Sequence, residues 1–249
     1  MRAMKSKLIL WTSIVYILSF LCYVPMLLRQ LEIPVPDGLL HLKYGFVLIP
    51  ALVTILFLLC ERQTGDYLTG LFKRISLKEL AVCAAIALTG VLVTCCYSFL
   101  SRKPLYSSAY PSLASLAVSC IYLFMTALAE EAAWRAFFFR SLAAGGEKTG
   151  AAVVTGAIWG IWHIPMWIIR NSLRLPEVIP LLVWVVLVSV VLGVFYYKFR
   201  NILSAALLHM ICNICFLAPA VWNDAVLLCC IFAGFAVCKK SSGNFRKSP

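Results

Sequence analysis

The segment from Ala127 to Phe139, ALAEEAAWRAFFF, contains two adjacent glutamates and an arginine inside an otherwise apolar run. A charged side chain at the centre of a bilayer costs at least about 2.5 kcal/mol on insertion scales, so such residues are candidates for function. Glu131 and Arg135 are four residues apart and can form an ion pair on one face of a helix. Glu130 points about 100° away from Glu131 and is available for another partner.

Two of the three histidines also lie in apolar segments, His163 in WGIWHIPMW and His209 in LLHMICN. Asn213 follows His209 by one helical turn, so these two hydrogen-bonding side chains project together. A carboxylate and a histidine can activate a water molecule, and a second histidine with an amide can donate hydrogen bonds to an oxyanion. Together with Glu130, these residues are the parts of a peptide-bond hydrolase that needs no nucleophilic side chain.

The composition indicates that a membrane surrounds these residues. The chain has 249 residues, of which 63% are hydrophobic and only 13% charged, whereas about half of the residues of a soluble domain are apolar. The net charge of +12 comes from basic residues scattered at the ends of apolar segments, which is typical of topology signals facing anionic headgroups. We therefore expect the lipid bilayer, and no nucleic acid, as a partner.

Eight apolar segments approach the roughly 20 residues that a membrane-spanning helix needs. They run from Leu8 to Leu28, Tyr44 to Cys60, Leu80 to Leu100, Leu113 to Phe139, Thr149 to Ile169, Ile179 to Tyr197, Ile202 to Leu217 and Val221 to Cys238. We expect an all-α, polytopic membrane helical bundle of about eight transmembrane helices, with the polar residues on the fourth, fifth and seventh.

The basic residues also predict the orientation. The side of the membrane that holds both termini of an eight-span chain carries 15 Lys and Arg residues, and the other side carries 6. Because cytoplasmic loops are enriched in Lys and Arg, we expect both termini in the cytoplasm and the protein in the cell (cytoplasmic) membrane. The segment from Glu61 to Lys78 mixes apolar and charged residues, which predicts an amphipathic helix on the cytoplasmic surface.

Three short motifs resemble those of the CAAX protease and bacteriocin-processing (CPBP) family, also called the abortive-infection family of membrane proteases. EEAAWR matches the motif EExxxR, HMICN matches HxxxN, and WGIWH resembles FxxxH with Trp159 in place of Phe. The motifs occur in the expected order on separate spans. The resemblance implies three regions: N-terminal transmembrane helices 1–3 (residues 1–110), a CPBP-like catalytic core (111–219), and a last transmembrane helix with a basic cytoplasmic tail (220–249).

The resemblance also implies roles for the motif residues. Glu130 would be the general base that activates water, with His163 assisting. His209 and Asn213 would form the oxyanion site. Glu131 and Arg135 would be a structural or substrate-orienting pair. The protein would then be an intramembrane endopeptidase that cleaves a peptide or membrane-protein substrate. Bacteriocin precursors are among the peptides that it could process.

Three alternatives remain at this point. Two histidines and a glutamate are zinc-ligand types, but the motif HExxH is absent, so we predict a glutamic mechanism with no cofactor and no metal, ahead of a zinc-dependent variant. A non-catalytic membrane partner, such as a bacteriocin self-immunity or scaffold protein, could retain the fold. A transporter could also use buried carboxylates and histidines, although no internal repeat is evident. The short, loop-poor chain suggests a bacterial origin. We therefore expect its substrates to be peptide precursors or membrane-protein segments rather than prenylated proteins.

Overall fold

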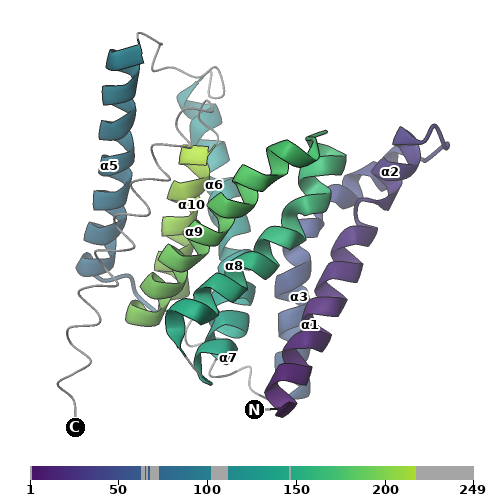
Figure 1. The fold of residues 1–249 in the computed structure, drawn as a ribbon, viewed down its shortest axis with the longest axis horizontal. Helices are drawn as coiled ribbons and strands as arrows, with labels where there is room; N and C mark the ends of the chain where they lie inside the picture. Colours follow the sequence, from purple (N-terminus) through teal and green to yellow (C-terminus); the bar gives the residue numbers. More distant parts are fainter. Residues whose placement is uncertain are drawn as a thin grey trace.

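The computed structural model describes residues 2–62, 65, 67, 73–101, 112–145 and 147–216. Within these ranges every regular element is a helix (Figure 1). In chain order they are α1 (Arg2–Leu21), α2 (Val24–Gln30), η1 (Asp37–Tyr44), η2 (Phe46–Leu48), α3 (Ile49–Cys60), α5 (Leu77–Ser101), α6 (Leu113–Glu131), η3 (Ala132–Phe139), α7 (Arg140–Ala143), α8 (Lys148–Pro165), η4 (Met166–Arg170), α9 (Leu175–Phe199) and α10 (Ile202–Phe216). The elements η1 and η2 are 3₁₀ helices, whereas η3 and η4 are π-helices.

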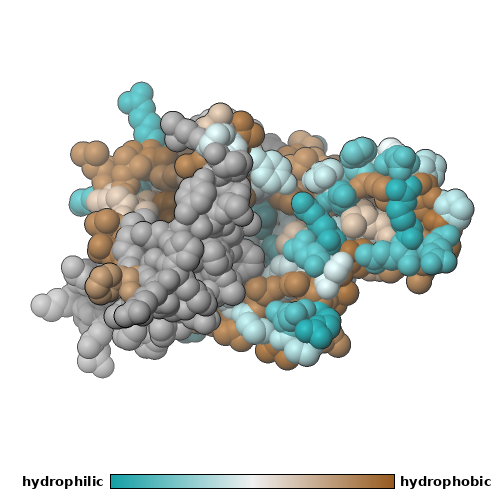
Figure 2. All heavy atoms as spheres, turned by 90° about the horizontal axis from the view of Figure 1, so that it is seen from above, coloured by the Kyte–Doolittle hydropathy of each residue, from teal (hydrophilic) through white to brown (hydrophobic). Residues whose placement is uncertain are grey.

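Five helical stretches in the described part are long and apolar enough to cross a membrane. They are Met4–Leu21, Asp37–Cys60, Ala114–Ala143, Lys148–Arg170 and Leu175–Phe199. Large apolar side chains on these stretches are exposed, among them Ile9, Leu56 and Ile121, as expected where lipid replaces water. Seen from above, hydrophobic side chains form much of the outline of the bundle, and hydrophilic ones gather over the region of α2 (Figure 2). The predicted all-α, polytopic membrane bundle is thereby confirmed.

The predicted spans agree with the helices to different degrees. The first segment was expected to be one helix from Leu8 to Leu28, but α1 ends at Leu21 and a separate helix, α2, begins at Val24. Pro25 lies in the first turn of α2, where its missing N–H costs nothing but where it could not continue α1. The third predicted segment corresponds to α5 and the seventh to α10, which is a shorter apolar helix.

Two further expectations fall outside the described residues. The predicted eighth span, Val221 to Cys238, lies beyond residue 216. The predicted amphipathic helix from Glu61 to Lys78 lies largely in the gap between residues 62 and 73, of which only residues 65 and 67 are described.

Contacts between distant segments identify one end of the bundle, which we call the basic end. Lys7 in the first turns of α1 forms an ion pair with Glu61 after α3. Lys73 donates a hydrogen bond to the carbonyl of Phe199 at 2.6 Å, and the Lys148 ammonium lies 4.2 Å from the centre of the Tyr197 ring. The start of α1 and the loops before α5, α8 and α10 therefore meet at one end of the bundle, as the predicted alternation of spans requires (Figure 1).

Helix α8 begins at the basic end because its first backbone amides are capped by a side chain. Glu147 is the N-cap residue, and its carboxylate accepts hydrogen bonds from the amides of Gly150 and Thr149. These bonds, with that from Gly150 the stronger, lower the pKa of the Glu147 carboxyl below its ordinary value. A Cβ atom at Gly150 would lie 2.8 Å from Glu147 Oε2, so the absence of a side chain at residue 150 gives the cap its room.

Helices α8 and α9 pack unusually closely because small residues line their contact. A Cβ atom on Gly156 of α8 would lie 2.7 Å from Cβ of Ser189 and 2.9 Å from Cα of Val186 on α9. A Cβ atom on Gly193 would lie 2.9 Å from Cβ of Ala152. Ser189 also donates a hydrogen bond to the Ala152 carbonyl at 3.0 Å. This close approach is typical of membrane helices, where packing replaces the hydrophobic effect as the driving force.

Helix α1 packs against the other side of α8 and against η3. The Trp11 ring lies 5.1 Å from Trp134 and 5.3 Å from Phe138, and its indole N–H donates to Thr54 of α3. Trp162 of α8 donates a hydrogen bond to Ser19 of α1 at 2.8 Å. The helices that carry the polar motifs are thus held from both sides.

Candidate active site

The two adjacent glutamates lie where the geometry of the fourth span changes. Glu130 and Glu131 are the last residues of α6, and the π-helix η3 begins directly after them at Ala132. Glu130 is 6% exposed, and Glu131 and Arg135 are fully buried. A π-helix holds one more residue per hydrogen-bonded turn than an α-helix and is frequently found at functional sites.

Trp159 connects the three motifs. Its indole N–H donates a hydrogen bond to Glu130 Oε2 at 2.8 Å, from α8 to α6. The ring centres of His163 and His209 both lie 5.2 Å from that of Trp159, each in an edge-to-face arrangement. The Arg135 guanidinium lies over the face of the same ring at 4.4 Å. One tryptophan therefore contacts residues of all three motifs in the interior of the bundle.

His163 is fixed in one tautomer by its own helix. Its Nδ1 lies 2.8 Å from the carbonyl oxygen of Trp159. A carbonyl can only accept, so Nδ1 carries the proton and, in the neutral ring, Nε2 offers its lone pair. Trp167 stacks on the ring at 5.4 Å, and Trp162 packs against it at 4.7 Å. This aromatic enclosure limits how the imidazole can turn.

His209 is oriented by Glu131. Its Nδ1 lies 2.9 Å from Glu131 Oε1, which joins α10 to α6. The same carboxylate oxygen lies 3.3 Å from Nη1 of Arg135, as the spacing of four residues predicts. Glu131 is thus placed between a guanidinium and an imidazole, and this link to His209 was not apparent from the sequence.

Arg135 has more donors than partners. Its three nitrogens and Glu131 Oε2 are buried without a hydrogen bond in the described structure; the contact at 3.3 Å is an ion pair only. Buried polar groups are nearly always hydrogen-bonded in native proteins, so donors of this kind mark a place where a further group can bind.

Asn213 is the predicted residue that the structure leaves apart. It lies on α10, one turn after His209, and is half-buried. Its side chain forms no hydrogen bond with any residue that the structure describes. Its place on the same helix as His209 keeps it available to a group bound beside that ring.

The arrangement of possible metal ligands bears on the zinc alternative. In the described parts of the chain, no three His, Cys, Asp or Glu side chains are grouped so that they could hold a metal ion.

Six site residues were predicted from the sequence, and all of them except Asn213 form one contact network. Trp159 also belongs to this network, although the sequence alone gave it no role in the site. Trp159 had been noted only as a replacement for Phe in the second motif. Its position four residues before His163 was the signal available, because residues at this spacing lie on one side of a helix.

Comparison with known proteins agrees with the motifs. Residues 112–215, less than half of the chain, match the model of the family described as type II CAAX prenyl endopeptidase, Rce1-like. No curated protein matches the chain. The family match confirms the resemblance to CAAX proteases over this segment, which contains all three motifs.

Proposed function

Because the segment 112–215 belongs to the type II CAAX prenyl endopeptidase, Rce1-like, family, we propose that the protein is an intramembrane endopeptidase that hydrolyses a peptide bond by a glutamic mechanism. Its substrate is a membrane-associated protein or a peptide precursor. Glu130 and His163 activate the water, and His209 and Asn213 stabilise the oxyanion.

The single observation that supports this proposal most is the convergence of Glu130, His163 and His209 on Trp159. A buried carboxylate next to two imidazoles is costly in a membrane, and a helix bundle has no structural need for all three. The hydrogen bond from Trp159 holds Glu130 Oε2, which leaves Oε1 for a water molecule.

Water activation follows from the hydrogen bonds that engage Glu130 Oε2 and His163 Nδ1. Glu130 takes a proton from the water molecule while the oxygen of that water attacks the peptide carbonyl carbon. His163 presents Nε2 as an acceptor, because Nδ1 donates to the Trp159 carbonyl, and so helps to orient the same water. The proton then passes to the leaving amine, and the peptide bond breaks.

Oxyanion stabilisation gives Glu131 a role that differs from that of Glu130. The contact of His209 Nδ1 with Glu131 Oε1 fixes the orientation of the imidazole that we propose as an oxyanion donor. Asn213 adds an amide donor from the same helix. Glu131 is therefore a positioning residue, and the unpaired donors of Arg135 favour a second role in binding a backbone carbonyl of the substrate.

The test is a cleavage assay on purified Glu130→Gln, with prenylated and unprenylated peptide libraries as substrates. Glutamine keeps the size of the side chain but cannot take a proton, so kcat/KM should fall at least about 100-fold. Asn213→Ala should cost a similar factor through loss of an oxyanion donor. Glu177→Gln is the matched control, because Glu177 forms an exposed ion pair with Arg174 at the start of α9, and it should cleave like the wild type.

The outcomes separate the alternatives. Full activity of Glu130→Gln would contradict the mechanism. Loss of wild-type activity in excess chelator, restored by zinc, would assign the same residues to a metalloprotease. Cleavage of no peptide by well-folded wild-type protein, together with co-purification of a bacteriocin or another protein, would support the non-catalytic partner.

We propose that the protein lies in the cell membrane with the basic end in the cytoplasm, because 15 Lys and Arg residues lie on the side of the predicted termini and 6 on the other. A reporter that is active only outside the cytoplasm, fused after Pro249, should stay silent. The same reporter inserted between α8 and α9, after Asn171, should be active. The reverse pattern would contradict this orientation.

A further inference from the structure

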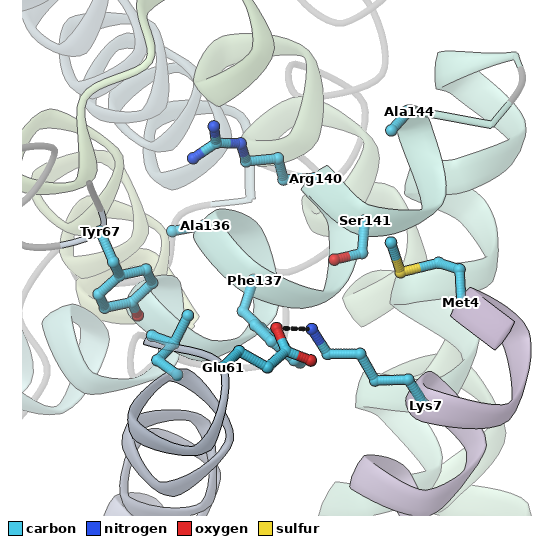
Figure 3. A pocket seen from close by; sticks show the side chains of 10 residues that line it. Met4, Lys7, Glu61, Tyr67, Ala136, Phe137, Arg140, Ser141 and Ala144 are labelled. Carbon is cyan, nitrogen blue, oxygen red and sulfur yellow. Dashed lines mark hydrogen bonds and ion pairs between the residues drawn. The ribbon is translucent and has the colours of Figure 1, made fainter. Parts of the chain in front are cut away.

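A pocket of about 590 Å³ opens at the basic end, and the residues that line it belong to none of the three motifs (Figure 3). Its walls come from the first turns of α1, the end of α3, Tyr67, and the turn from η3 into α7. Three candidate membrane spans begin or end here, at Met4, Cys60 and Ala143. The pocket therefore lies at the level where the hydrocarbon core gives way to lipid headgroups.

The charged side chains of the pocket carry one positive charge in excess. Lys7 forms an ion pair with Glu61, and its ammonium also lies 5.0 Å from the centre of the Phe137 ring. Arg140 is exposed and forms no ion pair with the parts of the chain that the structure describes. In Figure 3 the Lys7–Glu61 pair faces the Ser141 hydroxyl, and Arg140 extends above Ala136 on the side toward Tyr67.

Much of the remaining lining is apolar. Leu58, Ala136 and Phe137 are almost completely buried. The Tyr67 ring is also buried, and its hydroxyl donates a hydrogen bond to the carbonyl of Ala132 at 2.6 Å. That bond fixes the wall nearest the bundle interior. The pocket thus offers a cationic rim, with the Ser141 hydroxyl as a further donor, above an apolar floor.

We propose that this pocket binds the phosphodiester headgroup of an anionic glycerophospholipid. Arg140 and Lys7 donate to the phosphate oxygens, the Ser141 hydroxyl adds a neutral donor, and the glycerol backbone packs on Phe137 and Leu58. A guanidinium suits a phosphate because it presents planar, paired donors. Basic pockets between membrane helices on the cytoplasmic side bind acidic headgroups in this way. None of the residues proposed for catalysis lines the pocket, so lipid binding can be tested separately from cleavage.

The experiment measures binding of short-chain phosphatidylglycerol to the purified protein in neutral detergent by calorimetry and by the shift of Tm. Phosphatidylcholine of the same chain length and glycerophosphoglycerol without acyl chains are the comparison ligands. The protein carries Glu130→Gln throughout, so that a failure of the catalytic proposal does not affect the result. We expect phosphatidylglycerol to bind at least about tenfold more tightly than either comparison ligand.

The variants assign the binding to the pocket. Arg140→Gln should weaken phosphatidylglycerol binding at least about tenfold, the loss expected for one charge-assisted hydrogen bond. Arg140→Lys should retain part of the affinity. Lys198→Gln is the matched control. Lys198 is an exposed cation in the last turn of α9, at the basic end of the bundle but outside the pocket, so its replacement should change the affinity less than twofold.

Three results would overturn the proposal. Equal losses in Arg140→Gln and Lys198→Gln would mean general attraction to the basic end. Equal affinity for glycerophosphoglycerol would mean a site for soluble phosphodiesters. A loss of peptide binding in Arg140→Gln with unchanged lipid binding would assign the pocket to the substrate. Unfolding curves recorded without lipid identify any variant that fails to fold. If Arg140→Gln does not fold, the affinity of Arg140→Lys for phosphatidylglycerol is compared with that of the wild type instead.

Discussion

Two of the contacts that helix α8 makes, one with α9 and one with α6 and α10, differ in the side chains that form them. Against α9 it presents small residues, and the two backbones approach so closely that Gly156 and Gly193 leave no space for a side chain. Against α6 and α10 it presents Trp159, whose indole N–H donates to the buried Glu130 and whose ring packs edge-to-face on His209. The first contact is dry and satisfied, whereas the second contains donors without partners.

The difference teaches where stability and function reside in this bundle. Close packing of α8 on α9 gains dispersion energy and needs no polar group, so it can fix α8 firmly. The contact around Trp159 holds buried charge at a cost, and a native protein retains such a conflict mainly at functional sites. Substitutions on the two sides of α8 should therefore separate folding from activity.

The largest effect is expected for Glu131→Gln. Glu131 is the ion-pair partner of Arg135 and the hydrogen-bond partner of His209. Removing one member of a buried pair leaves an uncompensated charge and costs about 3–5 kcal/mol. The amount of folded protein after purification and its Tm should both fall sharply. A variant as thermostable as the wild type but inactive would instead make Glu131 a catalytic residue.

An intermediate effect is expected for Gly156→Ala. The new methyl group would meet Ser189 Cβ and the Val186 backbone at under 3.0 Å, so α8 and α9 must move apart, at a cost of about 1–3 kcal/mol. The Tm should fall while the folded fraction keeps most of its kcat. Gly38→Ala is the control, since a Cβ atom there has no neighbour within 4 Å. Equal Tm values for the two variants would contradict the close packing.

The smallest effect is expected for Trp159→Phe, which installs the residue that the FxxxH motif carries. The aromatic ring remains, but the hydrogen bond to Glu130 is lost. Hydrogen bonds to charged groups contribute about 1.5 kcal/mol or more, so kcat/KM should fall roughly tenfold, with a smaller change in Tm than in Gly156→Ala. Unchanged kcat/KM would mean that the indole N–H does not position Glu130.

The spans around the site were predictable from the sequence because apolar length decides them. The predicted segment from Leu113 to Phe139 has the bounds of α6 and η3 together, and that from Ile179 to Tyr197 lies within α9. The break after Leu21 was missed because the apolar run continues through it, and only Pro25 signals the new helix. The π-helices were missed because an apolar stretch reads alike in either helical form.

The site was predictable to the level of residue types and their helices. Charge inside an apolar run identified Glu130, Glu131 and Arg135, and the spacing of Glu131 and Arg135 gave their ion pair. Contacts between helices depend on how each one is rotated, which no local pattern encodes. For that reason the hydrogen bond from His209 to Glu131 and the place of Trp159 came only from the structure. The catalytic roles and the three-region division of the chain stay predictions.

The ion pair between Glu131, at the end of α6, and Arg135, in η3, has a consequence for the order in which the chain is made. His209 follows Glu131 by 78 residues, which a ribosome adds in roughly 4 to 16 s at 5–20 residues per second. During that interval α6 must enter the bilayer without its partner from α10. Arg135 is the one partner that Glu131 has as soon as its own helix exists. The pair therefore lets the segment with two carboxylates remain in the membrane until the last motif has been synthesised.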